Sequence, residues 1–183
     1  MVHFDETGIN IGKKRRWLHC TASEKWAAFY LHEKRGTEAM GEMGVLPLFQ
    51  GIAVHDHWKP YYKYDCTHAL CNAHHLRELT FAYEQDKQSW AKAMKTLLTD
   101  INKVVDEHGG SLKTSQAQDF RKQYRDILAE AEKECPAPVR APGDKRRGRL
   151  KRTKSRNLLE RLLSYECDVL YGKARSTFHQ QPR

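Results

Sequence analysis

Residues 51–58 read Gly-Ile-Ala-Val-His-Asp-His-Trp, and this stretch decides the fold expected for the first part of the chain. A compact apolar run after a glycine, here Ile52–His55, is typical of a buried central strand. Asp56 follows that run directly, so its carboxylate is expected at the exit of the strand. Residues 1–8, Met-Val-His-Phe-Asp-Glu-Thr-Gly, repeat the pattern, with Asp5 at the end of a short strand predicted over residues 2–5.

The two aspartates, Asp5 and Asp56, indicate a metal site if their strands are neighbours. Hard divalent cations prefer oxygen ligands. Two Mg²⁺ ions clamped by carboxylates activate a water or hydroxyl and stabilise the leaving oxygen at a phosphodiester. The pattern therefore favours a metal-dependent enzyme of nucleic-acid strand transfer. A single aspartate after a strand is most often a turn former or a helix cap, and such metal sites usually need a third carboxylate.

Composition sets the broad class of the protein. A chain of 183 residues is long enough for a domain with a core, while 39% hydrophobic and 30% charged residues predict exposed or extended segments. No apolar run approaches the roughly 18–20 residues that span a bilayer. Five irregularly spaced cysteines argue against a disulfide framework. A soluble, cytoplasmic protein without a membrane segment is expected.

A basic segment, residues 140–156, holds nine Lys or Arg and one acid, Asp144, a local charge of +8 within a formal net charge of +9. Such a run is either a solvated linker or a contact for the phosphate backbone, and its density favours nucleic acid. Lys59 is a further candidate, because aromatic residues surround it and bases stack on aromatic rings. The candidate DNA contacts are Lys59, Lys145, Arg146, Arg147, Arg149, Lys151, Arg152 and Lys154.

The remaining pattern predicts strands first and helices afterwards. Strands are expected over residues 16–21, 26–32 and 68–71, and a short helix over residues 36–44 with Gly44 as its stop. Apolar residues recur at intervals of three and four from Trp90 to Val105, which indicates an amphipathic helix. Another helix is expected to run to about Glu134, and a last one over residues 158–170. This order predicts an α/β core with a helical insertion or appendage.

A cluster of Cys and His, with Cys66, Cys71, His74 and His75, is open to three interpretations. It fits a zinc site poorly, since paired zinc ligands usually stand two to four residues apart on a turn. Buried cysteines followed by the start of a helix are the favoured interpretation. Alternatively, His74 or Arg77 faces the metal site, with the planar Arg77 guanidinium contacting phosphate.

These motifs, taken in order, resemble the catalytic region of the insertion-sequence-66 family of bacterial DDE transposases. The resemblance covers nearly the whole chain, from Met1 to about Leu170. The matching residues are 5–8, 34–36 with 39–40, 55–61, 71–79, 147–149 and 154–159.

The resemblance implies a ribonuclease-H-like mixed sheet with helices and a catalytic Asp-Asp-Glu triad that binds Mg²⁺ or Mn²⁺. Asp5 would be the first carboxylate and Asp56 the second, with His57, His74 and Arg77 as possible neighbours. Transposon ends would be hydrolysed, and the freed 3′-hydroxyl would attack target DNA, in a homo-oligomer when the protein is full-length. The implied domains are a partial catalytic core (1–88), a helical insertion (89–135), a basic linker (136–156), a C-terminal helix (157–172) and an out-of-frame tail (173–183).

The sequence departs from the family at the third carboxylate. The family carries its catalytic Glu in a motif resembling Asn-Asn-x-Ala-Glu after the last helix, whereas residues 176–183 read Ser-Thr-Phe-His-Gln-Gln-Pro-Arg. A frameshift near residues 172–177 is our hypothesis for this difference, and Glu160, Glu166 and Asp168 lie outside the motif. The family's upstream DNA-end-binding region is also expected to be absent. The chain is thus expected to be truncated and inactive alone, or else a DNA-binding remnant that interferes with a full-length transposase.

Overall fold

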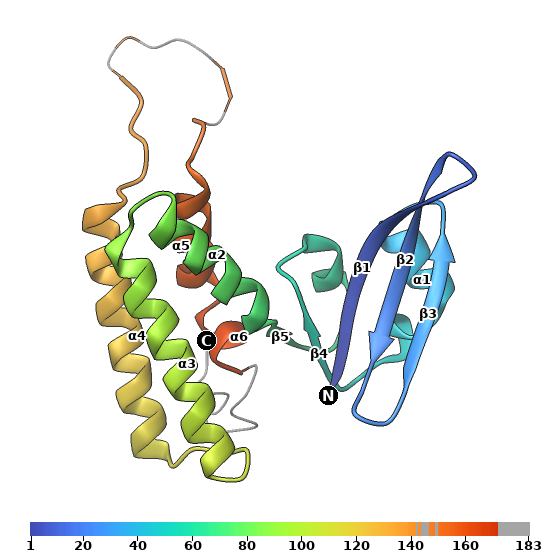
Figure 1. The fold of residues 1–183 in the computed structure, drawn as a ribbon, viewed down its shortest axis with the longest axis horizontal. Helices are drawn as coiled ribbons and strands as arrows, with labels where there is room; N and C mark the ends of the chain where they lie inside the picture. The colour runs from blue at the N-terminus through green and yellow to red at the C-terminus, as the bar shows by residue number, and fades with distance from the viewer. Residues whose placement is uncertain (142, 144–146, 149, 172–183) are drawn as a thin grey trace. The chain divides into compact units, whose positions relative to one another are not determined.

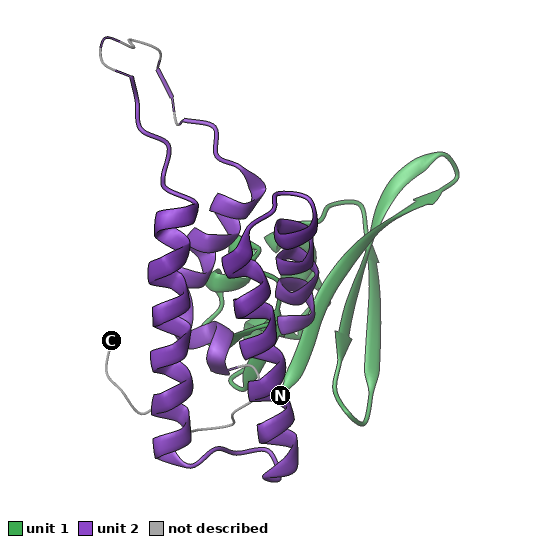
Figure 2. Ribbon diagram, turned by 60° about the vertical axis from the view of Figure 1, so that its left-hand side comes forward, with its two compact units in different colours: residues 1–71 green, residues 72–183 purple. Residues whose placement is uncertain are grey.

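The computed structural model describes residues 1–141, 143, 147–148 and 150–171. The chain divides into two compact units, residues 1–71 and residues 72–183 (Figure 2). The first unit is built on a β-sheet, and the described part of the second unit consists of helices and their connections. The out-of-frame tail expected over residues 173–183 lies outside the described residues.

The sheet of the first unit has five strands: β1 (Val2–Ile11), β2 (Lys14–Ala22), β3 (Ala27–His32), β4 (Ile52–His55) and β5 (Thr67–Leu70). Their order is β3-β2-β1-β4-β5 (Figure 1). The first three strands are antiparallel neighbours, whereas β4 is parallel to β1 and β5 is parallel to β4. This mixed sheet, followed by helices, confirms the α/β class and is consistent with a ribonuclease-H-like fold.

The first strand is much longer than the sequence pattern predicts. Backbone pairing with β2 continues from His3 as far as Ile11, which faces Lys14 across a two-residue turn. Gly12 and Lys13 form that turn with φ of 55° and 64°, the left-handed values that a tight hairpin turn requires. The placement of Asp5 at the end of a strand is therefore wrong, because cross-strand hydrogen bonds carry the strand well beyond it.

One short helix and two 3₁₀ turns pack against the core face of this sheet: α1 (Thr37–Met43), η1 (Leu46–Leu48) and η2 (Lys59–Lys63). Helix α1 ends at Gly44, whose φ of 76° confirms the predicted stop. The side chains that form the buried cluster are Val2, Phe4, Met40, Leu46, Ala53 and Tyr61.

The helices of the second unit are α2 (Asn72–Glu84), α3 (Ser89–Glu107), α4 (Thr114–Glu134), α5 (Lys154–Ser164) and α6 (Glu166–Tyr171). The apolar stripe predicted from Trp90 to Val105 is buried along α3. Tyr124 of α4 is fully buried, and its hydroxyl donates to the Leu162 carbonyl of α5 at 2.9 Å. None of the helices in the described part of the chain is both long and apolar enough to cross a membrane.

The last predicted helix is two helices in the structure. The backbone leaves helical geometry at Tyr165, between α5 and α6, with φ of −122° and ψ of 32°. Glu166 begins α6, where two arginines of α4 bind its carboxylate: Arg121 at 3.2 Å and Arg125 at 2.9 Å. The periodicity of leucines alone carries no sign of this break. Because the compact units divide after residue 71, α2 groups with the later helices, and the functional boundary at residue 88 stays a prediction.

Candidate active site

Asp5 and Asp56 are brought to the same level of the sheet by the pairing of β1 with β4. The parallel register joins Val2 to Ala53 and His3 to Val54. Continued by two residues beyond the last recorded pair, that register would put Asp5 opposite Asp56. Asp5 is exposed in the middle of β1, and Asp56 is half-buried directly after β4. The two candidate carboxylates are fifty-one positions apart in the sequence. One lies within β1 and the other directly follows β4, the strand that pairs with β1.

Contacts on both sides fix the Asp56 carboxylate. The backbone N–H of Trp58 donates to its Oδ1 at 2.8 Å. On the other side, Arg35 Nη2 lies 3.9 Å from its Oδ2. His57 follows in the sequence, and its ring lies 6.1 Å from that of Tyr62. The side chain of Asp56 is therefore held at the end of β4.

A buried acid, Glu6, lies beside this pair. Its side chain is 0% exposed and forms an ion pair with Arg35, whose Nη2 and Nε lie 2.5 and 2.7 Å from Oε1. The Tyr61 hydroxyl donates to Oε2 at 2.5 Å. Burial raises the pKa of Glu6 despite these two partners, which oppose the rise. We did not single out Glu6 from the sequence, although the alternation Val2, Phe4, Glu6 along β1 places it on the buried face.

Tyr61 is buried beside Glu6. Burial raises the pKa of its phenol first, and the negative charges of Glu6, Asp56 and Asp5 raise it further. Of these three carboxylates, Glu6 is the one in hydrogen-bond contact with the Tyr61 hydroxyl. The phenol stays protonated and donates its hydrogen bond to Glu6.

Arg35 connects the buried acid to two aromatic rings. Its guanidinium carbon lies 4.1 Å from the ring centre of Trp58 and 5.2 Å from that of Trp17. A guanidinium between indole rings is stabilised by cation–π attraction and loses little of its hydrogen bonding. Arg35 is thus positioned by groups from β1, β2 and the segment that follows β4.

A pair of histidines supports β4 from the buried side. His55 Nε2 lies 2.9 Å from His68 Nδ1, and the His55 ring stacks on Tyr61 at 4.5 Å. Burial lowers the pKa of His55 to about 4, although a hydrogen bond to the Asp56 carbonyl opposes the change. His55 is therefore neutral at pH 7 and adds no positive charge beside Asp56.

The other candidates are distributed over both units. His57 and Lys59 belong to the first unit, whereas His74 and Arg77 lie on α2 in the second unit, so their part in the site stays a prediction. Within the basic segment, Arg152 forms an ion pair with Glu160, and Lys154 lies 4.6 Å from the ring centre of Phe81. Arg147 and Lys151 are exposed. The candidates Lys145, Arg146 and Arg149 lie outside the described residues.

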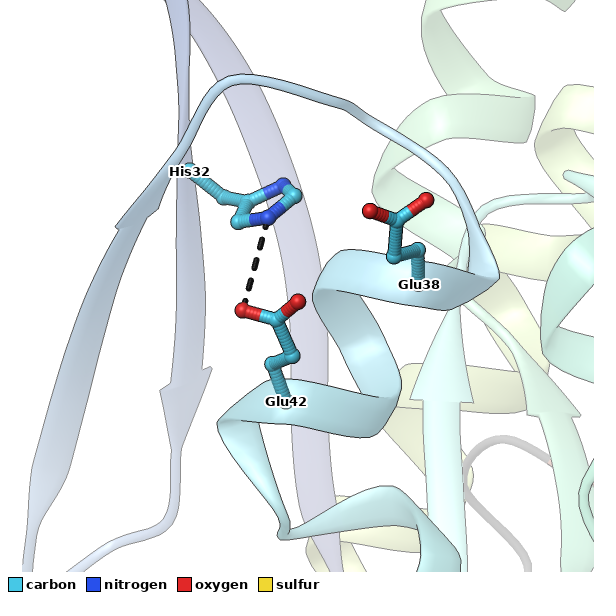
Figure 3. Close-up of side chains that lie close together, drawn as sticks. All are labelled: His32, Glu38 and Glu42. Carbon is cyan, nitrogen blue, oxygen red and sulfur yellow. Dashed lines mark ion pairs between the residues drawn. The ribbon is translucent and has the colours of Figure 1, made fainter.

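A different group has ligands close enough for one ion: His32, Glu38 and Glu42 (Figure 3). Among the described residues, these three form a group of His, Cys, Asp or Glu whose ligand atoms all lie within 4.8 Å of one another. Both glutamates are exposed and already bonded, since Lys34 Nζ lies 2.7 Å from Glu38 and the Tyr30 hydroxyl donates to Glu42 at 2.9 Å. The group does not include Cys66, Cys71 or His74, for which zinc binding remains the less favoured of the interpretations from the sequence.

The chemistry of Asp5 and Asp56 fits a divalent metal of the Mg²⁺ or Mn²⁺ type. Both side chains offer carboxylate oxygens, the ligands that these hard cations prefer. Asp5 Oδ1 accepts the Glu6 backbone N–H at 2.9 Å, so one of its oxygens is oriented by the strand itself. Glu160 and Glu166, considered as third carboxylates, are instead held in ion pairs with arginines inside the second unit.

Comparison with known proteins identifies the family of the chain. The sequence model of the family described as "Transposase IS66 family" matches residues 1–170. No curated protein and no solved structure matches the chain. The family match spans the sheet with its two aspartates and all the described helices as far as Leu170. The chain therefore belongs to the IS66 family of DDE transposases.

Proposed function

We propose that Asp5 and Asp56 are two of the metal-binding carboxylates of a transposase active site that cuts DNA and joins strands. The observation that supports this proposal is the parallel register of β1 with β4, which, continued by two residues, leads from β1 at Asp5 to Asp56 directly after β4. Membership of a DNA transposase family supplies the substrate class. The third carboxylate stays unassigned.

The residues around Asp56 prepare it for this role. The Trp58 N–H and the Arg35 guanidinium limit the orientations of its carboxylate, so little freedom is lost when a cation binds. Burial lowers the pKa of His55 to about 4, so this neighbour adds no positive charge beside Asp56 at pH 7. Divalent metals, when bound, would supply activation of the attacking oxygen and stabilisation of the leaving oxygen.

Two acids without the third predict a weak enzyme. No Asn-Asn-x-Ala-Glu motif occurs in residues 1–183. Because positioning contributes so much of the rate enhancement, loss of one metal ligand lowers the rate by orders of magnitude. We therefore propose that this chain alone cleaves DNA slowly or not at all.

Nicking of supercoiled plasmid in Mn²⁺ tests the proposal. The chain is compared with a chimera in which the Asn-Asn-x-Ala-Glu segment of an active family member replaces residues 173–183. We expect nicking by the chimera, its loss in Asp5→Asn and Asp56→Asn, and its retention in Asp65→Asn, which changes an exposed acid of the same unit. Nicking that survives both Asp5→Asn and Asp56→Asn would overturn the assignment. Nicking by the unextended chain that Asp5→Asn abolishes would show that another acid completes the site.

A further inference from the structure

The hairpin of β1 and β2 ends in a ribbon of two strands only. Strand β3 pairs with β2 no further than Trp17, and β4 pairs with β1 only at Val2 and His3. From Ile9 to Arg16 the ribbon therefore has open edges on both sides. Figure 1 shows its turn, in dark blue, at the free end of the sheet. We call residues 9–16 the basic ribbon.

Four successive cations occupy the tip of the basic ribbon: Lys13, Lys14, Arg15 and Arg16. Arg16 forms an ion pair with Glu33 at 2.7 Å. In the described part of the chain, no carboxylate lies within ion-pairing distance of Lys13, Lys14 or Arg15, all of which are exposed. By contrast, exposed lysines on the helices, such as Lys103 and Lys122, stand beside a carboxylate four residues away. The three cations at the tip thus form a local positive field without internal neutralisation.

Arg15 is held in place and does not extend freely into solvent. Its guanidinium carbon lies 5.0 Å from the ring centre of Trp17. The same guanidinium occupies the space above Gly8 that any Cβ would fill. Glycine at this position of β1 therefore allows the arginine to lie flat across the ribbon. A cation fixed in this way loses less side-chain entropy on binding a phosphate than a free lysine does.

The row of cations and rings continues toward the candidate active site. Trp17 lies between Arg15 and Arg35, and Arg35 in turn lies on Trp58. Alternating guanidinium and indole groups provide both phosphate contacts and stacking surfaces for nucleic acid. A ribbon of two strands also has the width that the major groove of DNA admits.

We propose that the tip of the basic ribbon, Lys13 to Arg15 with Trp17, binds the phosphate backbone of duplex DNA. At about 3.4 Å per residue, the tip lies roughly 25 Å along β1 from Asp5. That length corresponds to about seven base pairs of duplex DNA. The ribbon is thus a contact separate from the metal site, and only its position relative to the cleavage point rests on the proposed function.

Binding of a fluorescent 30-base-pair duplex, measured by anisotropy over a series of KCl concentrations in EDTA, tests the proposal. The ribbon variant carries Lys13→Asn, Lys14→Gln and Arg15→Gln, with asparagine at the left-handed position because it tolerates a positive φ. The matched control carries Lys95→Gln, Lys103→Gln and Lys133→Gln, three exposed lysines of the helices. Both variants lose three positive charges, and circular dichroism checks that both remain folded.

Each lost phosphate contact lowers the slope of log K against log salt by about 0.9. The ribbon variant is therefore expected to lose about 2 to 3 in this slope, while the control keeps the slope of the wild type. An unchanged slope in the ribbon variant, or an equal fall in the control, would overturn the proposal. Since EDTA removes divalent metal, the assay measures DNA binding without the metal site, and a failure of the metal-site assignment leaves this result untouched.

Discussion

Replacing Arg35 with methionine tests the buried network at the candidate site. Arg35→Met keeps an unbranched stem between Trp17 and Trp58 but removes the cation from Glu6, whose side chain is 0% exposed. A buried carboxylate without its partner costs about 3–5 kcal/mol. The remaining hydrogen bond from Tyr61 satisfies one oxygen only. A typical domain has a free energy of unfolding of about 5–15 kcal/mol, so a decrease of this size should be readily measurable.

Urea unfolding at pH 7, followed by tryptophan fluorescence and circular dichroism, measures the effect. The double variant Glu6→Gln/Arg35→Met should be more stable than Arg35→Met alone, because the buried charge is then gone. Arg16→Met is the matched control, since its partner Glu33 is 69% exposed and such surface pairs contribute at most about 1 kcal/mol. A loss below about 1 kcal/mol in Arg35→Met, or strictly additive effects in the double variant, would refute the reasoning.

Three further predictions concern stability. Burial lowers the pKa of His19 from 6.5, so the folded state binds fewer protons than the unfolded state. Stability that is present above pH 6.5 is therefore lost as the pH falls through the folded-state pKa. In His19→Gln the free energy of unfolding, measured in urea at a series of pH values, should depend less on pH over this range. Gly44→Ala should cost about 1 kcal/mol because φ is 76°, whereas Gly41→Ala, inside α1 with open space around it, should stabilise by up to about 1 kcal/mol, and equal shifts in urea midpoint would contradict this. Leu162→Ala, at a fully buried position, should cost about 2–5 kcal/mol in the same assay.

Local signals in the sequence were sufficient for several elements. The apolar run Ile52–His55 coincides with β4, because a short buried strand leaves a compact apolar block. Gly44 ends α1 because its left-handed backbone favours glycine. These features depend on neighbours in the chain, so the sequence is enough to predict them.

Features set by distant partners were missed. β1 continues past Gly8 because β2 pairs with it, and no local propensity records that pairing. The alternation along β1 places Glu6 on the buried face, but the Arg35 ion pair and the Tyr61 hydrogen bond that accommodate its charge come from residues distant in the sequence. The basic ribbon was not predicted for another reason. Acids elsewhere in the chain offset its charge in the sum over residues 1–139, so the net charge of the chain indicated only residues 140–156 as a basic segment.

Binding of Mn²⁺, followed by the loss of the free-ion electron paramagnetic resonance signal, tests the central claim most directly. It needs no third carboxylate and no cleavage. The account predicts that the wild-type chain and the control Asp65→Asn bind Mn²⁺ alike, while Asp5→Asn and Asp56→Asn each weaken binding by at least about tenfold. Equal Mn²⁺ binding by all four proteins would contradict the claim that Asp5 and Asp56 form one metal site.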